Sequence, residues 1–132
     1  MTNEVEIRRG PEDGRYVLMV DDSQFHLLRR AVVVFSYQEE SAAVRALVTG
    51  ADDAVPALAR PLQLDASYDD VVPRPVELTF AQLHAVYGIL TSLPTVDWAE
   101  EEFVERVGDF RETVLRTARL LRSGLLGSGL PV

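Results

Sequence analysis

The sequence predicts an α+β fold in which an N-terminal β-hairpin packs on a mainly helical body of about five helices. Two observations lead to this prediction. Two strand-like segments near the N-terminus flank a turn-rich insert, and most of the remaining chain repeats its apolar residues with helical spacing. A chain of 132 residues with 47% hydrophobic content can bury one core, so we expect a single domain over residues 1–123.

The hairpin is expected from residues 5–9 and 15–20, which are rich in strand-forming side chains. Between them stands the segment GPEDG at residues 10–14, where glycine and proline favour a turn. The two strands are therefore expected to pair with each other.

A first helix is expected after the hairpin, with Asp22 or Ser23 as its cap. Its apolar stripe consists of Phe25, Leu28, Val32 and Phe35. On this helix Arg29 and Arg30 would face water. The run VVVF at residues 32–35 suits a buried strand nearly as well, so the sequence leaves helix and strand open for residues 25–35.

A second helix is predicted over residues 39–48, and Gly50 ends it. A short helical turn follows, with Asp52 or Asp53 as its cap. After this turn, prolines and aspartates interrupt the chain without any sustained period. We therefore expect a loop or arm over residues 61–77.

Thr79 is expected to cap a helix that ends at Pro94. Residues 78–96 carry no formal charge over nineteen positions, which raises the question of a membrane span. Polar residues, a glycine and a proline interrupt this stretch, and its apolar residues recur with helical period. It therefore predicts a helix that is buried in protein.

Two more helices are expected on either side of Gly108, the first over residues 98–107 and the second capped by Asp109. The glycine-rich residues 124–132 are expected to form a flexible tail. The shared helical period predicts one core from these helices, made of Phe80, Leu83, Tyr87, Leu90, Phe103, Val107, Val114 and Leu121.

The composition excludes several kinds of chemistry. All thirteen basic residues are arginine, and valine outnumbers isoleucine eighteen to two, a bias typical of a GC-rich bacterial coding sequence. The absence of cysteine and lysine excludes a thiolate nucleophile, a disulfide and a lysine Schiff base.

The chain contains the residue types of a few common sites, but without their spacing. Asp22, Ser23 and His26 are the types of a catalytic triad, yet capping explains Ser23 and no Gly-x-Ser-x-Gly elbow is present. The three Asp-Asp pairs lack the spacing of metal ligands. We therefore expect no enzymatic activity, no metal and no cofactor.

The acidic residues favour a protein partner. The net charge is −8, and Asp97, Glu100, Glu101 and Glu102 gather around two aromatic residues, an arrangement that could dock a basic surface. Residues 1–10 contain no apolar run that could act as a secretory signal. We expect a small acidic cytoplasmic protein-interaction factor, such as a regulator, adaptor or toxin-neutralising protein. The oligomeric state is left open, a homodimer included.

The alternative hypothesis is a DNA-binding transcription regulator. The segment EFVERVGDFRETV, within a predicted hairpin over residues 98–122, resembles a bacterial helix-turn-helix. In such motifs the second helix enters the major groove, where Arg111, Arg116 and Arg119 would contact DNA. Asp109 stands where that motif usually has an aliphatic residue, and the net negative charge opposes nucleic acid. Nucleic acid is therefore the less favoured partner.

Overall fold

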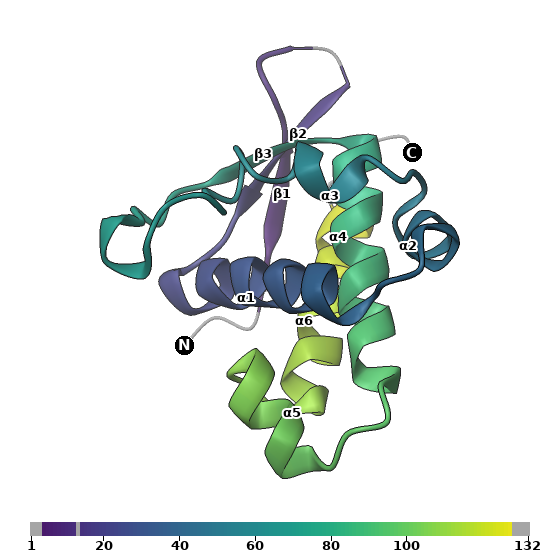
Figure 1. The fold of residues 1–132 in the computed structure, drawn as a ribbon. Coiled ribbons are helices and arrows are strands. Elements are labelled where there is room, and N and C mark those ends of the chain that lie inside the picture. Colours follow the sequence, from purple (N-terminus) through teal and green to yellow (C-terminus); the bar gives the residue numbers. More distant parts are fainter. Residues whose placement is uncertain (1–3, 13, 128–132) are drawn as a thin grey trace.

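A three-stranded antiparallel sheet packs against a body of helices (Figure 1). The computed structural model describes residues 4–12 and 14–127. Strands β1 (Glu6–Arg9) and β2 (Arg15–Met19) form the predicted hairpin, and β3 (Val76–Thr79) pairs with the other edge of β2. The α+β prediction, with an N-terminal hairpin on a mainly helical body, is confirmed.

Strand β3 is a difference from the sequence prediction, which places residues 76 and 77 in the loop or arm. Val76 and Leu78 are buried, whereas Glu77 between them is exposed. This alternation covers only four residues and follows a proline-rich stretch, so the sequence gives too short a period to recognise. Pairing of Val76 with Leu18 of β2 decides its structure. The loop before it contains a 3₁₀ helix, η1 (Tyr68–Asp70).

Helix α1 (Asp22–Gln38) settles the ambiguity over residues 25–35 in favour of a helix. Its cap is Asp21 rather than Asp22 or Ser23, and it forms a capping box with Gln24 in which each side chain accepts from the other residue's backbone N–H. The predicted apolar stripe is buried. The β-branched run is compatible with the helix because α4 and α5 pack against α1.

Helix α2 (Ala42–Thr49) begins at the Ser41 cap and ends at Gly50, whose φ of 90° is a left-handed conformation that favours glycine. The short helix α3 (Ala54–Ala57) follows. Asp53 occupies the N-cap position of α3, as predicted, but its side chain makes no capping hydrogen bond.

Helix α4 (Phe80–Ser92) lies in the middle of the helical body, with α1, α2 and α6 packed around it (Figure 1). Thr79 caps it through a box with Gln82, as predicted. The helix passes into the 3₁₀ helix η2 (Leu93–Thr95) at Pro94. Across residues 4–12 and 14–127, no helix is long and apolar enough to cross a membrane.

The predicted core is correct for six of its eight members, which are Leu83, Leu90, Phe103, Val107, Val114 and Leu121. Phe80 and Tyr87 are corrections, because their side chains are 41% and 37% exposed. Helix α4 carries apolar residues around most of its circumference, so periodicity alone does not say which stripe is buried. The neighbours of α4 cover the other stripes.

Helices α5 (Glu100–Val107) and α6 (Arg111–Gly127) flank Gly108, which has a φ of 91°. Helix α5 starts two residues later than predicted, after Ala99, which provides no side-chain cap. Residues 124–127, expected in the flexible tail, belong to α6, and residues 128–132 lie outside the described part of the chain. Gly124 allows α6 to pack closely on the Val5 carbonyl of the segment leading into β1.

Candidate functional site

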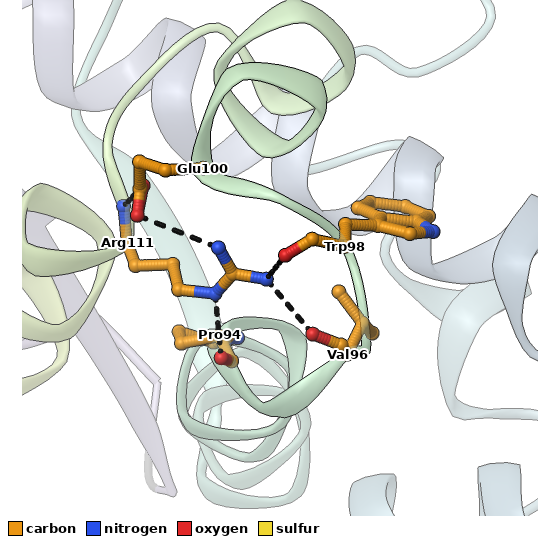
Figure 2. Close-up of polar contacts among 5 residues, drawn as sticks. All are labelled: Pro94, Val96, Trp98, Glu100 and Arg111. Carbon is orange, nitrogen blue, oxygen red and sulfur yellow. Dashed lines mark hydrogen bonds and ion pairs between the residues drawn. The ribbon is translucent and has the colours of Figure 1, made fainter.

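Arg111 joins the segment that follows α4 to the start of α6 (Figure 2). Its guanidinium donates to the carbonyl oxygens of Pro94 at 2.9 Å, Val96 at 2.8 Å and Trp98 at 2.5 Å. The Glu100 carboxylate accepts from the Arg111 backbone N–H at 2.9 Å and from Nη1 at 3.4 Å. The side chain is only 21% exposed, so these contacts give Arg111 a structural role.

The other two arginines of the DNA-binding hypothesis lie on the outer face of α6. Arg116 forms an exposed ion pair with Glu112 at 3.6 Å. Arg119 is exposed and makes no ion pair with any residue that the structure describes. Arg111 is therefore the member of this set whose guanidinium is bonded to backbone carbonyls, whereas that of Arg116 makes only an exposed ion pair.

The four acidic residues predicted to bind a partner do not form one uniform patch. Glu100 faces Arg111, and Glu102 forms an ion pair with Arg106 at 3.2 Å. Asp97 and Glu101 are exposed, without an ion pair among the described residues. Glu105, which lies one turn after Glu101, is also exposed and extends the acidic face of α5.

A trough follows the outer face of α1, and we call it the α1 trough. It consists of two adjoining hollows that share Arg30 and Val33. The first, of about 660 Å³, lies between α1 and α5 and is lined by Arg30, Val33, Val34, Tyr37, Gln38, Trp98, Glu102, Glu105 and Arg106. The second, of about 520 Å³, is lined by Ser23, His26, Leu27, Arg29, Arg30, Val33, Tyr68, Val107, Gly108 and Asp109.

The first hollow offers aromatic surface with charges around it. Tyr37 is 82% exposed, and Trp98 is half-buried beneath the Arg106 guanidinium, which lies 4.8 Å from the indole ring centre. Tyrosine, tryptophan and arginine are the residues that most often dominate binding energy at protein interfaces. Glu102 and Glu105 complete the rim on the α5 side.

The second hollow is lined by two of the three residues that the sequence grouped as a triad, Ser23 and His26, whereas the acid that lines it is Asp109 and not Asp22. The His26 ring stacks on Tyr68 with centres 5.2 Å apart, and its Nδ1 atom is buried without a hydrogen-bond partner among the described residues. Ser23 lines the same hollow without a hydrogen bond to His26. Burial raises the pKa of the Asp109 carboxyl above its ordinary value. Nothing in this geometry prepares Ser23 as a nucleophile.

Arg29 and Arg30 both line the trough; Arg30 is exposed, as predicted, whereas Arg29 is half-buried rather than facing water. Arg29 donates to three backbone carbonyls of residues 62–66 at 2.9 to 3.1 Å, and burial lowers the pKa of Arg29. Arg30 donates from Nε to the Arg106 carbonyl at 2.8 Å. Irregular segments leave carbonyls without regular partners, and a guanidinium can satisfy several of them at once.

Most of the trough is not among the predicted sites, although the sequence of α1 contains a signal for it. Ser23, His26, Arg30, Val33 and Tyr37 recur at intervals of three and four residues, which places them on one stripe of α1. This stripe can be recognised only once residues 22–38 are known to be helical. Tyr68 reaches it from a distant loop, which no local pattern predicts.

Comparisons with known proteins do not assign a function. No protein-family model, no curated protein and no solved structure matches this chain. Within residues 4–12 and 14–127, no three side chains of the His, Asp or Glu types gather as a metal site would require. Function is therefore inferred from the geometry of the α1 trough.

Proposed function

We propose that this protein is a small protein-interaction factor that binds a partner protein through the α1 trough. The observation that carries the proposal is the pairing of exposed Tyr37 with half-buried Trp98 in one hollow. An apolar side chain of the partner can fill the hollow between these rings, while the surrounding charged residues fix its orientation.

The charge of this region favours a basic partner segment. Two arginines and two glutamates line the hollow, and Arg106 is paired with Glu102. Glu105 is left without an ion pair among the described residues, and Asp97 and Glu101 add exposed carboxylates nearby in the chain, in a protein with a net charge of −8. Opposite charge accelerates the encounter and disfavours acidic competitors. The proposed ligand is therefore a peptide segment that combines an aromatic or branched aliphatic anchor with arginine or lysine.

A selection from random displayed peptides tests this proposal on the full chain. We expect the enriched peptides to combine basic residues with an apolar anchor, and their binding to weaken at high salt. Tyr37→Ala and Glu105→Arg should abolish most of the binding. Leu47→Ala removes an equally exposed side chain on α2, away from the trough, and should leave binding unchanged. Enriched peptides that bind both trough variants as tightly as the wild-type chain would disprove the proposal.

DNA recognition remains the second hypothesis, and the exposed guanidinium of Arg119 is the observation in its favour. Recognition helices usually contact bases through residues near their N-terminus. In α6 that position belongs to Arg111, which is bonded to carbonyls and to Glu100. The peptide-binding proposal uses side chains that are accessible, and we therefore favour it.

A further inference from the structure

One stripe of α4 is mostly aromatic and only partly covered by the rest of the described chain. Phe80, His84 and Tyr87 recur at intervals of four and three, so they share one face of the helix, and all three are exposed. Two hollows of about 390 and 260 Å³ adjoin there and share Phe80 and His84. We call this surface the α4 groove. Contiguous apolar surface of this kind often marks an interface.

The two sides of the α4 groove carry opposite charges. On one side, residues 49–57 contribute alanines, a glycine and the Asp53 carboxylate. On the other, α6 contributes two leucines and the Arg122 guanidinium. Asp53 makes no capping bond, and neither Asp53 nor Arg122 has an ion-pair partner in the part of the chain that the structure describes. The groove therefore presents one unpaired acid and one unpaired base across an apolar floor.

We propose that a second copy of this chain covers the α4 groove, with the two α4 helices packed side by side and parallel. A two-fold symmetric interface brings the same surface of both copies together. When its axis is parallel to the α4 helices, the α3 side of the groove in one copy lies opposite the α6 side in the other. Arg122 of each copy then faces Asp53 of the other. Phe80 and Tyr87 pack against their own counterparts.

The charges select this arrangement over the antiparallel one. A two-fold axis across the helices would keep each side of the groove on the same side, so Arg122 would face Arg122 and Asp53 would face Asp53. Like charges brought together at an interface oppose association.

The α4 groove and the α1 trough share no lining residue, so a dimer would leave both troughs open. Two troughs in one particle would bind a repeated or dimeric partner with avidity.

Sedimentation equilibrium of the full chain tests the dimer with two charge reversals. Arg122→Asp places two carboxylates opposite each other in a homodimer, and Asp53→Arg places two guanidinium groups opposite each other. Each variant alone should dimerise more weakly by at least about tenfold, as close charge pairs across interfaces imply. An equimolar mixture of the two variants should recover dimers, because every facing pair is then of opposite charge.

Two controls make this result specific. Arg119→Asp makes the same charge change one turn earlier on α6, outside the groove, and should dimerise like the wild-type chain. Thermal unfolding should confirm that every variant remains folded, since both positions are exposed. A wild-type chain that stays monomeric up to its solubility limit would overturn the proposal. So would wild-type dimers that neither reversal weakens, or a mixture that stays monomeric.

Discussion

The Glu100 carboxylate holds Arg111 at two points, accepting from its backbone N–H at 2.9 Å and from its guanidinium Nη1 at 3.4 Å. The first bond satisfies an amide in the first turn of α6 that has no partner within its helix. From the sequence, Glu100 is predicted to bind a protein partner and Arg111 to contact DNA. In the structure they stabilise each other and the junction between α5 and α6.

Replacement of Arg111 should destabilise the fold. Arg111→Ala removes the donor from three backbone carbonyls, and we expect the free energy of unfolding to fall by about 2–4 kcal/mol, as lost charge-assisted hydrogen bonds imply. Arg116→Ala breaks only an exposed ion pair and should change it by about 0.5 kcal/mol or less. Urea denaturation of both variants provides the measurement, and equal losses would contradict the structural role of Arg111.

Two glycines of α6 should respond in opposite ways to alanine. A Cβ atom at Gly124 would collide with the Val5 carbonyl oxygen, whereas one at Gly127 would meet no atom of the described chain within 4 Å. Gly124→Ala should therefore cost about 1–3 kcal/mol in spite of alanine's better helix propensity. Gly127→Ala should be neutral or slightly stabilising. Thermal unfolding distinguishes them, and a stabilised Gly124→Ala protein would show that α6 does not pack on Val5.

The two apolar stripes of α4 should differ in their contribution to stability. Leu83 is buried, and Leu83→Ala should lower the free energy of unfolding by about 2–5 kcal/mol through the cavity it leaves. Phe80 is partly exposed and packs on Tyr16, and Phe80→Ala should cost less, about 1–2 kcal/mol in the monomer. Denaturation at low protein concentration gives both values, and a larger loss for Phe80→Ala would reverse the assignment of the buried stripe.

The stability of the protein should depend on pH through Asp109. Because burial raises the pKa of this carboxyl, the folded state binds the proton more tightly than the unfolded state, and the ionised form destabilises the fold above that raised pKa. Asp109→Asn should therefore be more stable than the wild-type chain at neutral pH. The gain should shrink as pH falls, and vanish below the ordinary pKa of 3.8.

Thermal unfolding at several pH values measures this gain. Asp97→Asn, a change at an exposed aspartate, serves as the control and should alter unfolding little at any pH. A gain for Asp109→Asn that persists unchanged into acid would show that its cause is something other than ionisation.

Duplex DNA should bind weakly and without sequence preference at physiological salt, since a net charge of −8 opposes phosphate. Fluorescence anisotropy with random duplexes, followed by selection and sequencing, provides the measurement. Enrichment of one sequence, lost in folded Arg116→Ala and Arg119→Ala proteins, would favour the regulator hypothesis over peptide binding.

The sequence by itself determined the features that depend on neighbouring residues. The box between Thr79 and Gln82 joins groups three residues apart, and the helix ends at Gly50 and Gly108 depend on a single backbone conformation. The hairpin requires only two adjacent strands and the turn between them. Such short-range interactions leave their pattern in consecutive residues, which is why these predictions were correct.

Tertiary structure alone decided which strands pair, which side chains are buried and which hydrogen-bond partners a residue finds. β3 exists because β2 offers it a free edge, and Phe80 is partly exposed because Tyr16 of β2 and its other neighbours cover only part of its ring. Arg111 could have reached DNA, solvent or carbonyls from its place in the sequence. Its hydrogen bonds in the structure go to carbonyls thirteen to seventeen residues away, which folding brings within hydrogen-bond distance. Burial and partner geometry depend on contacts distant in sequence, and a local pattern does not contain them.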